Sequence, residues 1–424
     1  MNPITIITKK RDQQILTTEE LAFIAQGAAT GTIPDYQLAA WLMAVYINGL
    51  TDQETADLTR AMAESGDRVD LSGLPTPWAD KHSTGGVGDK TTIVLLPILA
   101  ACGLTVVKMS GPGLGKTGGT IDKLASIPGF RTDLTPEQMK AQANHIGIAL
   151  TGQTPSLAPA DKTLYALRDV TATVPCLPLI VSSILSKKIA GGADHVTLDV
   201  KCGSGAFMET PAEARRLADA LTKVGTAAGL KIRTAVTDMD QPLGRTAGNA
   251  LEIKEAIRIL QGQETGRFRD LCIHLAQITL ENCGILADPA FAIDSGAALM
   301  KMRQWVTAQG GSTEIFDHEE WQSASHIHEV LHLDEPGWIK SIDAEIVGLQ
   351  VVELGGGRKA KGDPIDYTVG IETLVQIGDQ IQTNQPQFRV HAATPESAEA
   401  TSNALSTAYK VSQEKVEPRN VIIQ

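Results

Sequence analysis

The spacing of apolar residues predicts a small helical region at the start of the chain. Apolar side chains recur at three- and four-residue intervals, at Leu38, Trp41, Leu42 and Val45, as expected for one face of an amphipathic helix. Thr17 with Glu20, and Thr51 with Glu54, have the spacing of capping boxes at helix N-termini. We therefore expect three consecutive helices, the second beginning at Pro34 and Asp35 and the third ended by Gly66.

The pattern changes after Asp80. Short apolar runs, separated by glycine-rich turns, occupy Thr91–Cys102, Thr105–Met109, Thr135–Ile146 and Gly147–Thr151. Further along, Thr210 and Glu213 form another capping-box pair, and a β-branched strand follows at Lys231–Thr237. Alternating helices and strands favour an α/β domain with a mostly parallel sheet. Ligands of such sheets bind beyond the carboxyl ends of the strands.

A third region begins near Gly337. Ile339–Val352 and Asp366–Val375 have the composition of strands, and Glu396–Tyr409 has that of a final helix. The predicted fold class is therefore α/β, with three domains. They are a helical N-terminal domain over 1–66 that is completed by about 160–190, an α/β phosphate-binding and catalytic domain over 75–330, and a C-terminal α+β domain over 338–424.

The composition excludes several classes of protein. Of the 424 residues, 42% are hydrophobic and 20% are charged, which suits a globular chain with a core. The net charge is −12 and no run of Lys and Arg occurs, so we expect neither a nucleic acid nor a membrane as a partner. Five cysteines without a CxxC pair favour a reducing compartment. Residues 1–14 lack the apolar core of a signal peptide, and we expect a cytoplasmic protein.

Two glycine-rich loops carry the densest chemistry. Residues 81–89 read Lys-His-Ser-Thr-Gly-Gly-Val-Gly-Asp, and residues 108–120 read Lys-Met-Ser-Gly-Pro-Gly-Leu-Gly-Lys-Thr-Gly-Gly-Thr. Glycines let the backbone approach a ligand, while lysines, hydroxyls and the first N–H groups of a following helix donate to an anion. One such loop is equally well explained as an ordinary turn. Two loops after successive elements indicate a phosphate held between them.

Two further motifs match known patterns by spacing alone. Gly113–Gly118 fits GxGxxG and nearly fits a Walker A loop, but Ser110 stands where the first glycine is required. His328–His332 matches the zinc-protease pattern HExxH, which needs a helix, and Asp334–Gly337 would end a helix there. We expect neither a nucleotide-binding P-loop nor a zinc site.

A third group of polar residues lies on predicted helices. Ser183 and Lys187 are four residues apart and share a helix face, and Arg168 lies on an earlier helix. A guanidinium, a hydroxyl and an ammonium facing one pocket can hold the O4, N3 and O2 edge of a pyrimidine. Without further context, a solvated helix face with ordinary ion pairs explains these residues better.

Together, these segments closely resemble the thymidine and pyrimidine-nucleoside phosphorylase family. The resemblance runs in order through Lys81–Asp89, Ser110–Phe130, Gly152–Val174, Pro178–Lys188 and Asp199–Met208, and includes Gly355–Arg358. It implies a small α domain, a larger α/β domain, a C-terminal α+β domain, a homodimer, and an active site in the cleft between the first two domains. It also implies reversible phosphorolysis, in which a pyrimidine nucleoside and inorganic phosphate give the free base and (2-deoxy)ribose 1-phosphate without a required cofactor.

Carried over residue by residue, the family's sites fall on the motifs above. The phosphate site would be Lys81, Ser83, Thr92, Lys108, Ser110 and Thr120. The base site would be His82, Arg168, Ser183 and Lys187, with His82, Arg168 and Lys187 as the catalytic residues. Lys108 resembles the broad-specificity members, because thymidine-specific ones have Met there. We therefore expect uridine, deoxyuridine and thymidine as substrates, with a thymidine-specific phosphorylase as the alternative.

Three positions on the phosphate side depart from the family pattern. Pro112, Lys116 and Ala125 stand where members usually have Arg, His and Glu. The joint loss of an Arg and a Glu suggests that the two normally pair. Because these substitutions bear on turnover, a catalytically impaired nucleoside-binding homologue is a second alternative.

The resemblance also implies a potassium ion held by Gly88, Leu243, Thr246 and Glu255. This chain has Lys90 where the broad-specificity members use a Thr hydroxyl. We therefore expect the ammonium of Lys90 to replace the ion and to pair with Glu255.

Residue chemistry separates this reaction from its nearest alternatives. Hydrolysis of a glycosidic bond would call for a pair of carboxylates, whereas the motifs here offer cations and hydroxyls. A related transferase for phosphoribosyl anthranilate-type substrates would need carboxylates for a pyrophosphate–magnesium site, and the sequence lacks that motif.

Overall fold

A computed structural model describes residues 1–111, 118–154, 156–360 and 362–424. The chain forms two compact units. The first, here called the helical unit, comprises Met1–Asp80, Gln153–Leu198 and Arg215–Thr234. The second, the sheet unit, comprises Lys81–Gly152, Asp199–Ala214 and Ala235–Gln424. Each unit is therefore assembled from three separate stretches of the chain.

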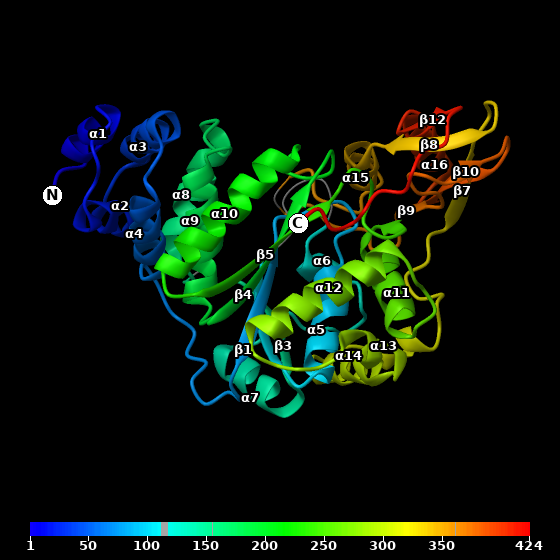
Figure 1. Cartoon of the computed structure of the whole chain (residues 1–424), viewed down its shortest axis with the longest axis horizontal. Helices are drawn as coiled ribbons and strands as arrows, with labels where there is room; N and C mark the ends of the chain where they lie inside the picture. The colour runs from blue at the N-terminus through cyan, green and yellow to red at the C-terminus, as the bar shows by residue number, and fades with distance from the viewer. Residues whose placement is uncertain (112–117, 155, 361) are drawn as a thin grey trace. The chain divides into compact units, whose positions relative to one another are not determined.

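The helical unit is a bundle with its own core. Its helices are α1 (Pro3–Arg11), α2 (Thr18–Thr30), α3 (Asp35–Asn48), α4 (Asp52–Ala63), α8 (Pro159–Val170), α9 (Leu177–Ala190) and most of α10 (Pro211–Ala227). The predicted capping boxes form, since the side chains of Thr17 and Thr51 accept from the N–H groups of Glu20 and Glu54. α8 packs on α2, and α9 packs on α4 (Figure 1). The core between these helices includes the fully buried Trp41.

A five-stranded sheet has the strand order β3-β2-β1-β4-β5. Its strands are β1 (Trp78–Ser83), β2 (Thr105–Ser110), β3 (Ile148–Gly152), β4 (His195–Cys202) and β5 (Lys231–Asp238). β2 and β3 pair in parallel, and β4 is buried along its whole length. Burial on both faces is typical of parallel strands that are covered by helices.

Helices of the sheet unit follow and cover these strands (Figure 1). They are α5 (Thr91–Ala101), α6 (Thr120–Ala125), α7 (Pro136–Ile146), α11 (Asn249–Leu260), α12 (Arg267–Asn282), α13 (Pro289–Asp294) and α14 (Ala297–Ala308). α5 contacts β2, α12 and α14. Because α5 is enclosed by these neighbours, it is apolar on all its faces.

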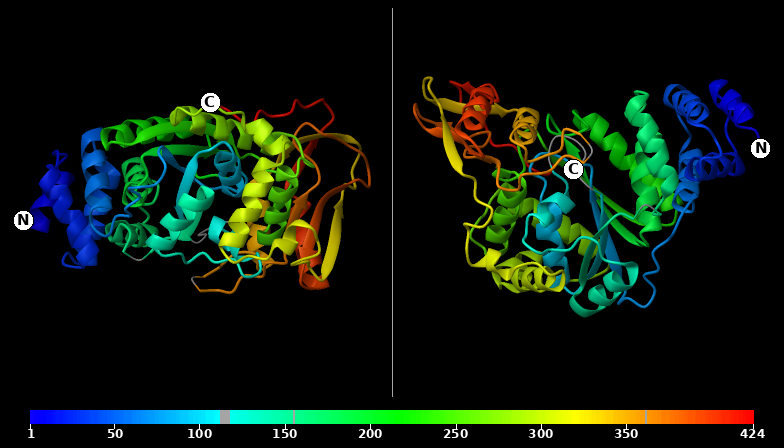
Figure 2. Two further views of the ribbon diagram at one scale, coloured as in Figure 1. Left: turned by 90° about the horizontal axis from the view of Figure 1, so that it is seen from below. Right: turned by 180° about the vertical axis from the view of Figure 1, so that it is seen from behind.

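The C-terminal part of the sheet unit is antiparallel. One sheet has the order β6-β9-β11-β7 and a second the order β10-β8-β12. The strands are β6 (Thr246–Ala247), β7 (His326–Leu331), β8 (Gly337–Ile342), β9 (Gly370–Thr373), β10 (Gln380–Ile381), β11 (Pro386–Ala392) and β12 (Tyr409–Ser412). The short 3₁₀ helix Thr313–Phe316 precedes β7, and α15 (Ala344–Glu353) and α16 (Pro395–Leu405) accompany the later strands, as the yellow-to-red part of Figure 2 shows. The predicted α/β class with helical N-terminal and α+β C-terminal parts is confirmed.

Three of the predictions made from the sequence were wrong. Residues 344–353 form α15 and not a strand, because Asp343 caps the helix at the N–H of Ile346 and Val347 and Val351 face the core at helical spacing. The final helix ends at Leu405, before β12. The N-terminal region has a fourth helix, α1, whose apolar residues show little periodicity.

No helix in the described part of the chain is long and apolar enough to cross a membrane.

Candidate active site

The predicted phosphate-binding residues lie where strands of the sheet unit end and helices begin. Lys81 and Ser83 are on β1, and Lys108 and Ser110 are on β2, its neighbour in the sheet. Thr92 lies in the first turn of α5, and Thr120 begins α6. The first N–H groups of a helix and its dipole favour an anion at such a place. The strand order thus brings the two glycine-rich loops to neighbouring strands, as phosphate binding between them requires.

Lys81 is fully buried, and its ammonium is balanced by an aspartate. Its Nζ donates to Thr91 Oγ1 at 2.9 Å and lies 3.4 Å from Asp199 Oδ2. The same carboxylate lies 2.6 Å from the Nζ of Lys201, and its Oδ1 accepts from Thr237 at 2.6 Å. Both lysines and Asp199 have 0% of their surface exposed. One buried carboxylate therefore serves two buried ammonium groups.

Asp89 is the second carboxylate of this group. Its Oδ2 accepts from Ser83 Oγ at 2.5 Å, and its Oδ1 accepts from the hydroxyl of Thr91. Burial acts to raise the pKa of Asp89, but the ammonium groups of Lys81, Lys201 and Lys123 and the Ser83 hydrogen bond outweigh it and hold the pKa well below its usual range. Asp89 is therefore ionised at neutral pH.

The remaining phosphate candidates differ in exposure. Lys108 is buried and donates from Nζ to the carbonyl oxygen of Lys81. Ser110 and Thr120 are half-buried, whereas Thr92 is buried. Of the positions that depart from the family pattern, Ala125 ends α6. Pro112 and Lys116 lie outside the described residues.

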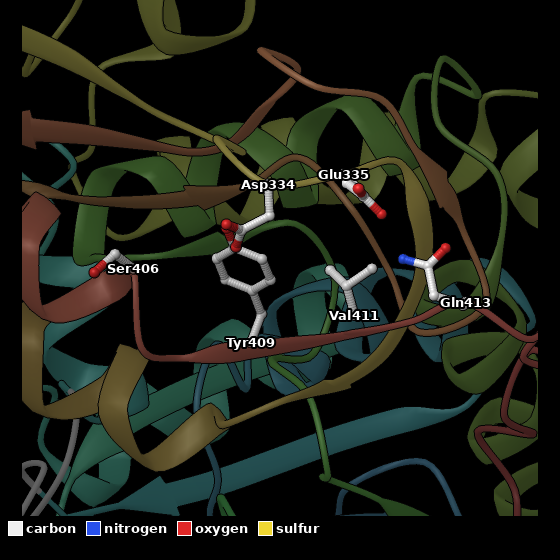
Figure 3. Close-up of a pocket in the computed structure, with 6 residues that line it drawn as sticks. All are labelled: Asp334, Glu335, Ser406, Tyr409, Val411 and Gln413. Atoms are coloured by element: carbon white, nitrogen blue, oxygen red, sulfur yellow. The ribbon is translucent and has the colours of Figure 1, made fainter.

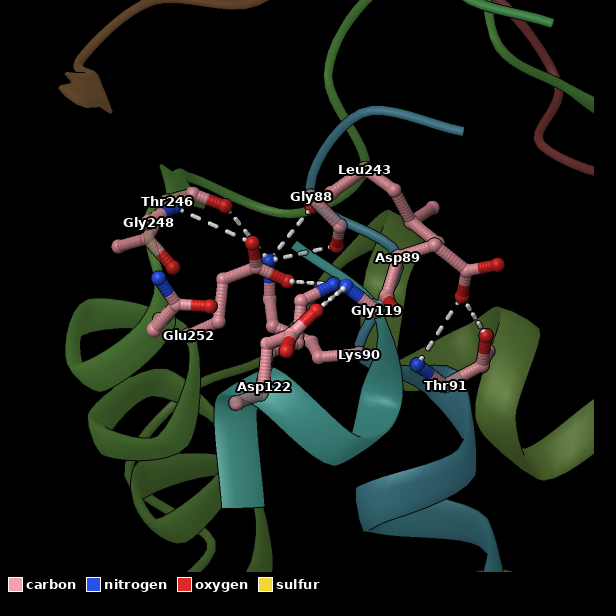
Figure 4. Close-up of polar contacts among 12 residues, drawn as sticks. Gly88, Asp89, Lys90, Thr91, Gly119, Asp122, Leu243, Thr246, Gly248 and Glu252 are labelled. Atoms are coloured by element: carbon pink, nitrogen blue, oxygen red, sulfur yellow. Dashed lines mark hydrogen bonds and ion pairs between the residues drawn. The ribbon is translucent and has the colours of Figure 1, made fainter. Parts of the chain in front are cut away.

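The predicted ion site holds the side chain of Lys90 (Figure 4). Its Nζ donates to three backbone carbonyl oxygens, those of Gly88 at 3.0 Å, Leu243 at 2.7 Å and Thr246 at 2.9 Å. It also lies 2.9 Å from Glu255 Oε2. The ammonium occupies the centre of this group of oxygens, so the residues present do not fit a potassium ion in addition.

Three of the predicted base-site residues lie together in the helical unit. Ser183 and Lys187 share one face of α9, and Lys187 Nζ donates to Ser183 Oγ at 2.9 Å. Asp161 of α8 accepts from the same ammonium at 2.5 Å. The side chain of Lys187 keeps 22% of its surface exposed. Asp161 and Ser183 thus hold the ammonium in place, and the Lys187 side chain is partly exposed whereas Ser183 is buried.

Arg168, also on α8, is engaged with the backbone. Its guanidinium donates to the carbonyl oxygens of Thr173 at 3.3 Å, Val174 at 2.6 Å and Leu179 at 3.1 Å. The ring of Tyr165 lies 5.7 Å from its Cζ. Burial lowers the pKa of Arg168. In this arrangement the guanidinium fixes the segment that leads into α9, and it thereby supports the residues that follow.

His82 lies on β1 in the sheet unit and is half-buried. Of the four predicted base-site residues, Arg168, Ser183 and Lys187 thus belong to the helical unit and His82 belongs to the sheet unit.

The sequence reading missed the carboxylates that balance the predicted cations. Asp199 and Lys201 are two residues apart on β4 and therefore point to the same face of the sheet, which could have marked them as a pair. Lys123 and Glu252, which lie 2.8 Å apart, gave no signal because they are distant in the sequence.

Two other places carry no features of an active site. The HExxH segment falls on strand β7, where Glu329 pairs with Arg389 at 2.9 Å, and is not helical. A surface pocket of the C-terminal part is lined by Asp334, Glu335, Ser406, Tyr409, Val411 and Gln413 (Figure 3). Its two carboxylates disfavour phosphate, and none of the predicted site residues lines it.

Comparison with known proteins shows the family to which the chain belongs. Family models match residues 4–66 as the helical bundle domain of a glycosyl transferase family, 75–300 as the a/b domain of that family, and 338–412 as a pyrimidine nucleoside phosphorylase C-terminal domain.

Similar whole proteins agree with these matches. Pyrimidine-nucleoside phosphorylases from Geobacillus stearothermophilus and from Staphylococcus aureus strain N315 are each 44% identical to this chain, over 92% of it and 92% of their own lengths. The crystal structure of anthranilate phosphoribosyltransferase from Thermus thermophilus is 19% identical and has a TM-score of 0.57 over 72% of this chain and 99% of its own, which shows a shared fold. The chain belongs to the pyrimidine-nucleoside phosphorylase family of glycosyl transferases.

Proposed function

We propose that the protein catalyses the reversible phosphorolysis of uridine, deoxyuridine and thymidine, giving the free base and (2-deoxy)ribose 1-phosphate. The observation that carries this proposal is the 44% identity, over 92% of the chain, to proteins named pyrimidine-nucleoside phosphorylase. The substrates are then a small nucleoside and inorganic phosphate, without a required cofactor.

The sheet unit supplies the phosphate side of the reaction. A phosphate oxygen forms a bond to C1′ of the sugar, while the bond between C1′ and the base nitrogen breaks and its electron pair leaves with the base. Ser110, Thr120 and the N-terminus of α5 are the donors proposed to hold the phosphate, because Ser110 ends β2, Thr120 begins α6, and α5 follows β1, the neighbour of β2. The ammonium groups of Lys81, Lys123 and Lys201, which stabilise the ionised Asp89, also offset the negative charge that a phosphate adds there.

The helical unit supplies the base side. Negative charge develops on the departing base, mainly at O2 and O4, and donors that are already in position stabilise it without reorganisation. Lys187 provides an ammonium that Asp161 orients, Ser183 provides a hydroxyl beside it, and Arg168 adds a second cation. His82 is the candidate acid for the base, because the unperturbed pKa of histidine, about 6.5, lies near working pH.

The proposed range of nucleoside substrates is argued from Lys108. Its ammonium is hydrogen-bonded to the carbonyl oxygen of Lys81 on the neighbouring strand, and the Lys at this position resembles the broad-specificity members of the family. We therefore propose that ribosides and deoxyribosides are both cleaved.

The test is the release of uracil and thymine from uridine, deoxyuridine and thymidine, followed by absorbance with and without phosphate. Phosphate-dependent release from all three nucleosides is expected. Release from deoxynucleosides alone would assign the protein as thymidine-specific. Binding of nucleosides without turnover would assign it as an impaired homologue and would direct attention to Pro112 and Lys116.

We further propose that two copies of the chain associate through the helical unit. Tyr36, Met43 and Ile47 are spaced along one face of α3 and are 74%, 38% and 71% exposed. An exposed apolar stripe of this kind suits a second copy better than water. Sedimentation of the purified protein is expected to give the mass of a dimer, and Ile47→Glu to shift it towards the monomer. A monomeric wild-type protein would contradict this proposal.

A further inference from the structure

The buried ammonium of Lys90 is bound as a free cation would be. Four oxygen atoms from three different segments converge on its Nζ, at distances of 2.7–3.0 Å. Three of them are backbone carbonyl oxygens, the ligands that replace the hydration shell of K⁺ in selective pores. An ammonium has only three N–H groups for these four oxygens. The group of oxygens is therefore arranged around the charge as a whole, and not around three hydrogen-bond directions.

The size of this group of oxygens points to a large monovalent cation. Mg²⁺ binds oxygen at about 2.0–2.1 Å and Ca²⁺ at about 2.3–2.6 Å, both shorter than the distances around Nζ. The single carboxylate gives one negative charge, which one ammonium neutralises. Glu255 is fixed from the other side, because its carboxylate accepts from the N–H groups of Arg245 at 2.8 Å and Thr246 at 2.9 Å.

The backbone around Nζ leaves little freedom for other arrangements. Gly88 and Gly244 both have positive φ, at 71° and 74°. A Cβ at Gly88 would lie 2.7 Å from the Thr246 carbonyl oxygen, and one at Gly244 would lie 2.2 Å from Glu255 Oε1. Glycine is therefore needed at both positions for the carbonyl groups to close around the cation.

The same ammonium joins the first glycine-rich loop to α11. Gly88 belongs to that loop, and Glu255 lies on α11. The next carbonyl oxygen of the loop, that of Asp89, accepts from Lys123 Nζ at 2.9 Å, and Lys123 pairs with Glu252, one turn before Glu255. Two lysines and two glutamates thus fix two consecutive peptide groups of the loop.

We propose that Lys90 is a built-in monovalent cation that positions the phosphate-binding loop, so that this protein works without a free potassium ion and becomes dependent on one when the Lys90 ammonium is removed. Lys90 is a positioning residue, which acts through Gly88 and Asp89. The ion-binding part of the proposal stands on the geometry alone, whereas the part concerning phosphate rests on the proposed function.

The first experiment compares cations on the wild-type protein. Thermal unfolding is measured in KCl, NH₄Cl, NaCl and choline chloride at one ionic strength, so that general screening is constant. The wild-type melting temperature is expected to be the same in all four salts, because the site already holds its charge. Selective stabilisation of the wild type by K⁺ would overturn the proposal.

The second experiment removes the ammonium in two ways. Lys90→Ser leaves space at the site, and Lys90→Met fills that space without a charge. Both are expected to lower the melting temperature by roughly 5–10 °C in choline chloride, because Glu255 loses its buried partner. NH₄⁺ or K⁺ is expected to raise that of Lys90→Ser by about 2–4 °C over choline, and to leave Lys90→Met unchanged.

Lys123→Ser is the matched control. It also removes a buried lysine that pairs with α11 and with the same loop, but among the described residues Lys123 contacts one backbone carbonyl and not three. It is expected to be destabilised without a selective response to NH₄⁺ or K⁺. An equal response of both serine variants, or none in a folded Lys90→Ser protein, would overturn the proposal. If Lys90→Ser does not fold in any of the four salts, the comparison of cations on the wild-type protein tests the proposal by itself.

Kinetics separates positioning from general stability. In choline chloride, Lys90→Ser is expected to raise the KM for phosphate at least about tenfold while the KM for uridine changes less than about twofold, and NH₄⁺ is expected to reverse the rise. An equal rise of both KM values would show a structural role alone and would overturn the positioning role. If neither the wild type nor any variant releases base, the proposed function fails, while the unfolding experiments still test the built-in cation.

Discussion

The phosphate-side residues of the sheet unit and the base-side residues of the helical unit are held in different ways. On the phosphate side, Lys81, Lys90 and Asp199 are fully buried, and each charge is matched by a buried partner. On the base side, Lys187 is partly exposed and Asp161 is its ion-pair partner. The first region fixes its charges inside the protein before any ligand arrives, whereas in the second the ammonium-bearing side chain of Lys187 stays partly exposed and Arg168 is buried.

Buried and partly exposed ion pairs are expected to respond differently to the loss of one partner. Buried ion pairs are sensitive to the loss of either partner, because the remaining charge has no water to stabilise it. A partly exposed ammonium keeps access to water, so its loss affects ligand binding more than folding. Substitutions on the phosphate side are therefore expected to change stability, and those on the base side to change catalysis.

The largest expected effect is that of Asp199→Asn. It leaves the ammonium groups of Lys81 and Lys201 without their shared carboxylate, and is expected to cost about 3–5 kcal/mol of unfolding free energy. Chemical denaturation measures this loss. Asp294→Asn, which removes the exposed partner of Arg269, is the control and is expected to change stability by less than about 1 kcal/mol. Equal effects of the two substitutions would contradict the comparison.

Lys187→Met is expected to lower kcat/KM for uridine by about 10²–10³, the usual cost of losing one donor to a charge that develops in the transition state. Its melting temperature is expected to fall less than that of Asp199→Asn, because Lys187 is partly exposed, although the buried Asp161 loses its partner. Lys162→Met, on the exposed face of α8, should leave both quantities unchanged. Unfolding of Lys187→Met with no specific loss of rate would show that the base side is structural.

A smaller effect concerns stability in acid. The pKa of Asp89 is lowered in the folded protein, so its contribution to stability is present above the unfolded pKa and is lost as pH falls through the folded pKa. The wild type is therefore expected to lose stability below about pH 4 more steeply than Asp89→Asn. Melting temperatures between pH 3 and 7 measure the slope, with Glu399→Gln on the surface of α16 as the control. Parallel slopes for wild type and Asp89→Asn would contradict this reading.

The smallest expected effect is that of Glu329→Gln in the HExxH segment. Glu329 pairs with Arg389 on an exposed strand, so the substitution is expected to cost less than about 1 kcal/mol. Uridine phosphorolysis should be unchanged, because the segment is a strand outside both candidate regions. Loss of activity, or bound zinc in the purified wild type, would show that the motif has a role of its own.

Much of the fold could be predicted because local signals agreed with the structure. The capping pairs at Thr17 and Thr51 mark real helix starts, and the glycine-rich loops do follow neighbouring strands. The prediction of a strand over residues 344–353 was wrong for a physical reason. The β-branched residues there, Ile346, Val347, Val351 and Val352, favour strands locally, but packing on the C-terminal core holds them in a helix.

The residues of the candidate site could be predicted from the sequence, but their ion-pair and hydrogen-bond partners could not. The resemblance placed Lys81, Lys187 and the oxygens around Lys90, but the sequence could not show that Asp199 balances Lys81 from a strand more than a hundred residues away. The state of Arg168, whose donors bind backbone carbonyl groups, depends on the fold of the segment before α9 and likewise has no sequence signal.

The proposed function assigns phosphate to the sheet unit and the base to Arg168, Ser183 and Lys187 of the helical unit, with His82 of the sheet unit as the candidate acid. The most direct measurement is the pair of KM values, for phosphate and for uridine, in Ser110→Ala and Ser183→Ala, which remove the same hydroxyl from each region. Ser110→Ala is expected to raise the KM for phosphate about tenfold or more and to leave that for uridine unchanged. Ser183→Ala is expected to raise the KM for uridine about two- to tenfold and to leave that for phosphate unchanged. Equal changes in both KM values for either variant, or the reverse pattern, would contradict the account.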